Sequence, residues 1–600
     1  RRWVRPGPRS TMPTRPALLA ALAAAPALAA PPQSPTSASG TPDALVRFAP
    51  DSAAVWIESR AHGPLLEEGL EHPAVSALLE LPGVRESLDN PPEDVLLAGW
   101  SLLGADPLEV AHDLTADGVG VAFVLSRRGP RPVLVARGTS DEDAYEDALE
   151  AVTRALVNIQ LAKPVSAKRC KGLGVLEAWS FTGTRRAGLA RVDERTLIVA
   201  QDPADLEDAL EHGRRGGIPK DMVRHLQAAA HGEADVFAWF DLDRFYESGS
   251  DLDEFSAMPW DPGAQIFLGP VLSHFGGASE ASVALRLGGN AWTAELLGTG
   301  RARKGADVLF PDEERADALL QKLPSDLAYL ELHRDVGALL ANRTDLVGAR
   351  KLPGLAEAVG NIGLLAGGPD AADALIAALE PDWTVLVHPI EFGETPTPDV
   401  PLPALTLVAR LADPEKNEAR FLQAFQSGAA LIGADRAQKG EPNVLLGVEM
   451  MSGIPVYKAT LDPPGEGAAV DLAYNLSPGC CVIDGVAVLG THYRAVRSAA
   501  ERLRGGHDHA PKPAAPGPRR GIDRVAIDGP AFTELLAQNR ELLTTRAVLV
   551  EGKPRDRAEA EFDLVLALAK RIGRIELTTD GTVRPARNLS ARLTVELVDR

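Results

Sequence analysis

Short apolar runs, typical of strands, alternate with amphipathic stretches, typical of helices, along most of the chain. Residues 196–199 (TLIV) predict a strand. Asp202 and Pro203 follow it, and they are a natural N-cap and first residue for the next helix. Residues 119–137 predict a hairpin that turns at 127–130 (RRGP), where Gly and Pro interrupt the apolar pattern.

Two further hairpins are predicted, one late in each half of the chain. Residues 281–298 are expected to turn at 288–290 (GGN). A strand at 574–579 is expected to turn at Asp580-Gly581 toward a closing strand at 593–598. Because the strands of a hairpin run antiparallel, the predicted class is α+β, with antiparallel meanders and packed helices.

Landmarks of the first half recur in the same order in the second half. An apolar strand follows a turn at Asp193-Glu194 and again at Asp484-Gly485. The matched segments are 50–66 with 324–340 at an offset of 274, 134–137 with 407–410 at 273, 196–199 with 487–489 at 290, and 238–241 with 525–528 at 287. This near-constant spacing predicts two tandem copies of one α+β unit. The alternative is chance similarity among Ala- and Leu-rich segments.

The N-terminal segment predicts export. Met12 is the predicted start, Arg15 supplies a basic residue, 17–25 form a short apolar core, and Ala27-Leu28-Ala29 is a cleavage pattern. The alternative is a disordered Ala- and Pro-rich tail. The predicted organisation is a signal peptide at 1–29, a flexible linker at 30–42, a first unit at 43–300, a connector at 301–319, and a second unit at 320–600 with a Pro-rich loop at 505–520.

No later run is long and apolar enough to predict a transmembrane helix. The mature protein is therefore expected to be soluble, in the periplasm or outside the cell.

The repeated order of turn, strand and amphipathic helix at 193–211 and 484–500 resembles a known pattern, as does the opening of each half. Together they resemble a family of large exported bacterial proteins of unknown function with a duplicated α+β unit. The resemblance implies export and the duplicated architecture. It implies no activity, because that family has no established one.

Composition narrows the possible partners. Hydrophobic residues make up 45% and charged residues 24% of the chain, which is ordinary for a globular protein. The net charge of −21 predicts repulsion of phosphate backbones, and no basic stripe with interleaved aromatics offsets it. Nucleic acid is therefore not expected as a partner.

Cysteines are few, and none of them predicts a disulfide framework. The three are Cys170, Cys480 and Cys481. Adjacent cysteines bond only in a strained ring, so the prediction is three small buried apolar side chains. The sequence does not decide whether any of the three forms a disulfide.

No motif predicts catalysis, a cofactor or a metal site. The chain has no Gly-x-Ser-x-Gly elbow, Walker loop, dinucleotide fingerprint or His-Glu-x-x-His. His507-Asp508-His509 is the one dense ligand cluster, and it falls in the Pro-rich loop, where little would fix its geometry. No catalytic, cofactor-binding or metal-binding residue is therefore assigned.

Two pairs of polar residues recur in both halves. Asp241 and Asp528 precede helices, so they are predicted to be N-caps rather than paired catalytic carboxylates. Arg60 and Arg334 are predicted to anchor a turn, with an anionic ligand as the alternative. His62 stands against Val336, but a single asymmetric residue does not define a site.

The favoured function is an exported, non-catalytic binding or scaffolding protein of the bacterial cell envelope. The sequence identifies no partner, and it leaves open an envelope protein or a ligand in an inter-domain cleft. The alternative is a secreted or periplasmic hydrolase whose catalytic residues are dispersed in sequence.

Overall fold

The computed structural model describes residues 45–60, 103–247, 278–300, 327–463, 472–505 and 521–598, with short gaps in these ranges. The fold is α+β with antiparallel strand pairing, as predicted. The chain forms two compact units. Unit 1 is Arg1–Phe240 with Ala284–Gly289, and unit 2 is Asp241–Val283 with Asn290–Arg600. The predicted signal peptide, linker, connector and residues 506–520 of the Pro-rich loop lie outside the described residues.

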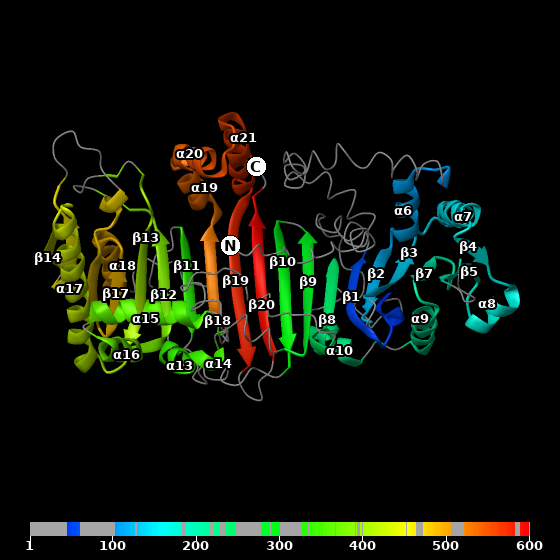
Figure 1. Ribbon diagram of the computed structural model, residues 1–600, viewed down its shortest axis with the longest axis horizontal. Coiled ribbons are helices and arrows are strands. Elements are labelled where there is room, and N and C mark those ends of the chain that lie inside the picture. Colours follow the sequence, from blue (N-terminus) through cyan, green and yellow to red (C-terminus); the bar gives the residue numbers. More distant parts are fainter. Residues whose placement is uncertain are drawn as a thin grey trace, which may run out of the picture. The chain divides into compact units, whose positions relative to one another are not determined.

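Unit 1 is built on an antiparallel sheet with a helix on each face (Figure 1). Across the sheet, the strands are β8 (Val236–Asp241), β1 (Ala53–Arg60), β2 (Gly118–Val124), β3 (Arg131–Arg137), β7 (Thr196–Ala200), β6 (Leu189–Arg191), β5 (Glu177–Phe181) and β4 (Ala162–Pro164). Leu197 packs with α7 (Glu142–Asn158), whereas the next residue, Ile198, packs with α9 (Pro203–Arg215). The two helices therefore cover opposite faces.

Unit 2 repeats this plan. Across its sheet, the strands are β18 (Gly521–Asp528), β11 (Ala328–His333), β12 (Leu379–His388), β13 (Ala404–Leu411), β17 (Val486–Gly490), β16 (Gly479–Ile483), β15 (Ile454–Leu461) and β14 (Val444–Met451). On one face, Ala487 packs with α17 (Pro414–Lys439). On the other, Val488 packs with α18 (Tyr493–Gly505).

Three more strands extend the sheet of unit 2 beyond β18. In order, they are β19 (Ile572–Thr582), β20 (Asn588–Leu597) and β10 (Ala291–Thr299). The strand β9 (Glu280–Gly288) precedes β10, so strands flank the predicted turn at 288–290 on both sides.

The remaining helices complete the described chain. They are η2 (Leu45–Phe48), α6 (Pro107–Thr115), α8 (Ala167–Leu173), α10 (Lys220–Ala228), α11 (Leu242–Glu247), α13 (Val336–Ala341), α14 (Arg343–Leu346), α15 (Leu352–Ala366), α16 (Pro369–Ala377), η7 (Leu472–Asn475), α19 (Gly529–Gln538), α20 (Arg540–Glu551) and α21 (Arg555–Ala569).

The strand order from β8 to β4 is the same as the order from β18 to β14. Within this order, Trp56 of β1 pairs with Trp239, and Tyr329 of β11 pairs with Ala526. Trp239 and Ala526 are matched in sequence at the offset of 287. Trp56 and Tyr329 therefore occupy the same position in their sheets.

Along β1 and β11, the sequence match at an offset of 274 is wrong by one residue, because it aligns Val55 with Tyr329. The physical reason is a β-bulge between Ala53 and Val55, which adds one residue to β1. Beyond the bulge the offset is 273, the value that also relates residues 134–137 to 407–410.

One of the predicted two-residue turns is present in the structure, and another is not. Asp484 and Gly485 have φ angles of 47° and 77° and join β16 to β17 as a two-residue turn, as predicted. The turn expected at Asp580-Gly581 is wrong, because β19 continues through it. Asp580 pairs with Ser590, and Gly581 with Leu589. Continued pairing with β20 overrides the local turn preference of Asp-Gly.

Candidate functional site

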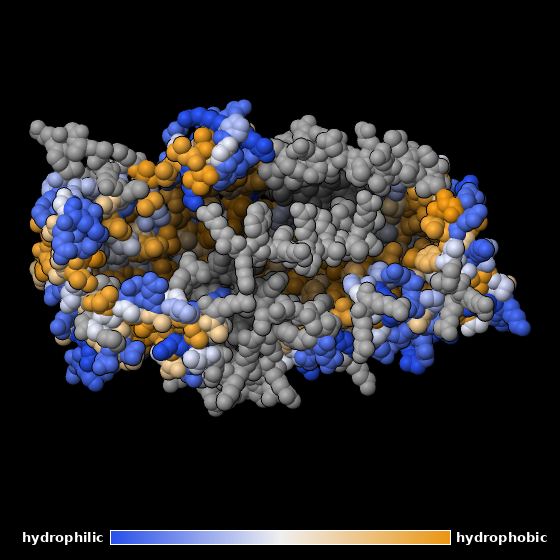
Figure 2. Space-filling view, in the orientation of Figure 1, coloured by the Kyte–Doolittle hydropathy of each residue, from blue (hydrophilic) through white to orange (hydrophobic). Residues whose placement is uncertain are grey.

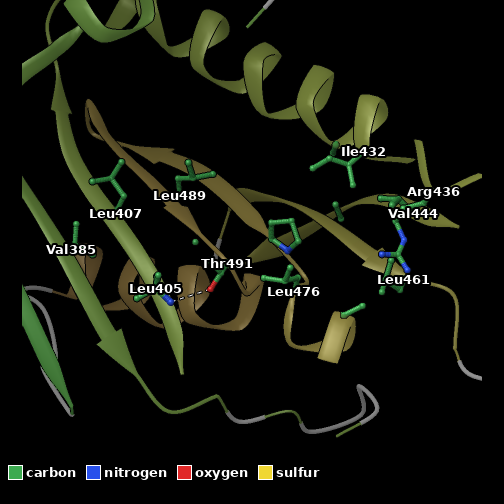
Figure 3. Close-up of a pocket in the computed structure, with 15 residues that line it drawn as sticks. Val385, Leu405, Leu407, Ile432, Arg436, Val444, Leu461, Leu476, Leu489 and Thr491 are labelled. Atoms are coloured by element: carbon green, nitrogen blue, oxygen red, sulfur yellow. Dashed lines mark hydrogen bonds between the residues drawn. The ribbon is translucent and has the colours of Figure 1, made fainter. Parts of the chain in front are cut away.

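A cavity of about 440 Å³ lies in unit 2 between α17 and the sheet (Figure 3). The sheet side is formed by Leu405 and Leu407 of β13 and by Leu489 of β17. On the helix side, Ala429 and Ile432 close over them. These residues come from segments far apart in the chain, and the strand order brings them to one face.

The far wall of the pocket comes from the edge of the sheet. Val444 of β14 and Ala459 and Leu461 of β15 line it, and Leu476 follows η7 on the same side. Ile432, Leu405 and Leu476 are each about half exposed, at 49%, 46% and 57%. Because these large apolar side chains face solvent at the rim, the pocket is open along one side.

Two polar side chains reach the pocket. Arg436 donates from Nε to the carbonyl of Pro442 over 3.1 Å, and its Nη1 lies 3.2 Å from the Glu441 carboxylate. The Thr491 hydroxyl accepts a hydrogen bond from the Leu405 N–H over 3.0 Å, as Figure 3 shows. The charge of Arg436 is therefore compensated locally, and its aliphatic stem covers the apolar wall. The lining suits an uncharged, apolar occupant.

The pocket exists because α17 is longer than its counterpart. α17 has 26 residues and α7 has 17, which is a difference of more than two helical turns. The first half of α17 packs tightly through Phe421 and Phe425. Ala429, Ile432 and Arg436 lie in the second half of α17, and this half forms the roof of the pocket.

A second difference lies in the sheet. Strand pairing places Trp179 against Leu189 in unit 1 and Tyr457 against Cys480 in unit 2. Counting two residues along each strand, Phe181 takes the position of Ala459. Phe181 packs against the α7 core, whereas Ala459 leaves its space to the cavity.

The repeated aspartates are helix caps, as predicted. Asp528 is the N-cap of α19, and its Oδ1 accepts from the Ala531 N–H over 2.9 Å. Asp241 accepts from the Arg244 N–H over 3.0 Å at the start of α11. Burial is the main cause that raises the pKa of Asp241. Neither carboxylate lines the pocket.

Arg60 forms a local contact in its own strand. Its Nε donates to Glu58 over 3.3 Å, and the indole N–H of Trp56 donates to the same carboxylate over 3.1 Å. Glu331 occupies the position of Glu58 in β11, and both carboxylates are buried. Arg334, His62 and the His507–Asp508–His509 cluster lie outside the described residues.

All three cysteines are free and buried, as predicted. Cys480 faces α17, and Cys481 faces α18. Burial raises the pKa of Cys481 to about 12 and that of Cys480 well above its usual value. Thiols in such surroundings are poor nucleophiles.

The nearest approach to a catalytic arrangement is His333 with Asp382. Nδ1 of His333 lies 2.6 Å from the carboxylate, which is the geometry that orients a general base in catalytic triads. Its Nε2 is buried and has no hydrogen-bond partner, so no hydroxyl or thiol in the described part of the chain completes a triad.

Among the buried histidines of the described chain, His492 directly precedes α18. His492 is fully buried, stacks on Tyr493 with ring centroids 5.3 Å apart, and accepts from the Arg494 N–H over 3.4 Å. Burial, with smaller effects from Arg494 and His388, lowers the pKa of His492 to about 4. The ring is therefore neutral at physiological pH.

Within the described ranges, no group of three or more His, Cys, Asp or Glu side chains could hold a metal ion. None of the helices in those ranges is both long and apolar enough to cross a bilayer. No family model, curated protein or solved structure matches the chain.

Sequence motifs could not reveal this pocket, because its two polar side chains, Arg436 and Thr491, belong to no recognisable motif. The available signal was an unusually long helix at 414–439 followed by an apolar strand at 444–451 (VLLGVEMM). Neither pattern is specific for a ligand.

Proposed function

We propose that this protein is an exported, non-catalytic binding protein of the bacterial cell envelope, and that its pocket in unit 2 holds an apolar chain such as the acyl chain of a lipid. The observation that carries the proposal is the apolar cavity between α17 and the sheet. Pockets that bind small molecules are concave, mostly apolar and supplied with few polar groups, and this one has that composition.

The rim gives the occupant an orientation. The half-exposed Ile432, Leu405 and Leu476 leave one side open, so a polar head can stay in water while the chain is buried. Each buried methylene contributes about 0.8 kcal/mol, which corresponds to an affinity gain of about fourfold.

Export and tandem duplication belong to the same proposal. The signal-peptide pattern from Met12 to Ala29 supports export. The common strand order and the shared position of Trp56 and Tyr329 support two copies of one unit. In this view, the second copy acquired a pocket through a longer helix, while the first kept a filled core.

The test measures binding of a homologous series of alcohols, from octanol to hexadecanol, to the purified mature protein by calorimetry. Affinity should rise with each added methylene and then level off once the chain fills the pocket. Ala459→Phe gives position 459 the phenyl ring that its equivalent, Phe181, has in unit 1. The ring occupies the cavity and should weaken binding by at least about tenfold. The matched control is Ala430→Phe, at an exposed residue of α17 next to the pocket-lining Ala429, which should leave affinity unchanged.

Folding of the two variants is checked by thermal unfolding. Ala459→Phe should keep or raise the melting temperature, because the new ring fills an existing cavity rather than displacing neighbours. No binding by the wild type, or unchanged binding by a folded Ala459→Phe, would refute the proposal.

A hydrolase is the second candidate, and the His333–Asp382 pair is what favours it. The test is a screen of chromogenic esters, phosphates, glycosides and peptides. Turnover that His333→Gln abolishes in a folded protein would establish this alternative. The proposed binding function predicts no turnover in either protein.

A further inference from the structure

β14 is an edge strand of the sheet in unit 2. Within the described chain, β15 alone pairs with it, in an unbroken register from Val444 to Met451. The Asp462 N–H donates to the Asn443 carbonyl over 3.0 Å. Because hydrogen bonds alternate along an antiparallel pair, the backbone groups of Leu446, Val448 and Met450 point to the unpaired side.

Side chains along this strand are apolar and exposed. Leu445, Leu446, Val448 and Met450 expose between 49% and 65% of their surface. Figure 2 shows hydrophobic side chains, in orange, beside α17 at the end of unit 2 where β14 lies. Contiguous apolar surface on an edge strand marks a site of association.

The equivalent edge of unit 1 has the protection that β14 lacks. β4 takes the same place in its sheet but has only 3 residues, and these include Lys163 and Pro164. Short length, lysine and proline are the devices by which proteins block edge pairing. β14 has 8 residues without Lys, Pro or a bulge. Because the edge strand is blocked in unit 1 but not in unit 2, we infer that a binding partner covers β14.

We propose that β14 pairs antiparallel with β14 of a second copy of this chain, in a symmetric dimer that joins the two unit 2 sheets. A two-fold axis at Val448 places Val448 opposite Val448 of the second copy and Leu446 opposite Met450. The outward backbone groups of these residues then satisfy one another. The proposal is independent of the pocket.

The charge pattern of the strand favours a second copy as the occupant. Glu449 is the only charged residue of β14. In the proposed register it faces Gly447 of the other copy, so no like charges oppose each other. Glu449 is also neutralised within its own chain, by Lys458 and Arg497, each at 3.1 Å. Apolar residues meet apolar ones on the α17 side, as cross-strand pairing requires.

Sedimentation velocity of the full mature chain tests the proposal. The wild type should have the mass of a dimer, and Val448→Lys should halve it, because two lysines then face each other at the axis. The control is Val550→Lys, since Val550 is equally apolar and 73% exposed but lies on α20. This variant should remain a dimer.

A second measurement does not depend on how well Val448→Lys folds. Val448→Cys should form a covalent dimer with a short bis-maleimide linker, since opposed residues lie about 5 Å apart at their Cβ atoms. The native cysteines are buried, and Val550→Cys should cross-link much less. A monomeric wild type, a larger assembly, or equal cross-linking of the two cysteine variants would overturn the proposal. A monomer that binds lipid vesicles through the same strand would overturn it as well.

Discussion

Phe181 in unit 1 and Ala459 in unit 2 occupy the same position in sheets of the same strand order, yet only Phe181 fills the space beside its helix. This side chain is one of two differences between the closed core of unit 1 and the open pocket of unit 2. The longer α17 adds the roof, so both differences are needed for the cavity.

The converse substitution, Phe181→Ala, should destabilise unit 1 without creating a binding site. Phe181 is half-buried, so its loss should cost about 2 kcal/mol of unfolding free energy. α7 ends too early to roof the space that is left. Urea unfolding measures the first effect and calorimetry with dodecanol the second. New apolar binding attributable to unit 1 would show that helix length is not required.

Asp528→Ala should lower the unfolding free energy by about 1 kcal/mol, because the Ala531 N–H loses its cap acceptor. Asp528→Asn keeps the acceptor and should restore most of that stability. Ligand affinity should be the same in both variants, since Asp528 is remote from the pocket lining. A variant with normal stability but lost binding would contradict the capping role.

His492 should make the protein less stable as the pH falls. Its folded pKa of about 4 is below the unfolded value near 6.5, so the unfolded chain binds the proton first. The stability is fully present above pH 6.5, and about 3 kcal/mol should be lost on acidification through about pH 4. His492→Gln removes this dependence. The difference between wild-type and variant unfolding curves, measured from pH 4 to 7, isolates it from the carboxylates. Parallel curves would disprove the assignment.

The three cysteines should resist thiol reagents in the folded protein. Cys480 and Cys481 are fully buried with raised pKa values, and Cys170 is buried in the unit 1 core. Labelling with a chromogenic disulfide should follow the unfolding rate and reach three thiols per chain only in denaturant. Rapid labelling of the native protein would show that these cores open locally.

Much of the fold followed from local pattern. The hairpin at 119–137, the Asp202 cap and the Asp484-Gly485 turn are formed by residues close in sequence, and each is present as predicted. The predictions were wrong where pairing between strands distant in the sequence determines the structure. Pairing with β20 carries β19 through Asp580-Gly581, and a bulge in β1 shifts the relation to β11 by one residue.

The pocket could not be predicted in the same way. Leu405, Ala459 and Leu489 are ordinary strand residues, and the cavity depends on what is missing between them. A single alanine where the other unit has a phenylalanine leaves no recognisable pattern in the sequence. The absence of a catalytic signature left binding as the favoured function, but only the strand order could locate a candidate site.

The pairing of β10 with β20 has a consequence for biosynthesis. Thr299 pairs with Asn588, so β10 leaves the ribosome long before its partner is made. During that interval, an apolar strand edge is open to incorrect pairing. Because β20 closes this edge, a chain cut off before Asn588 should expose the edge of β10 and associate with other chains instead of behaving as a slightly shortened protein.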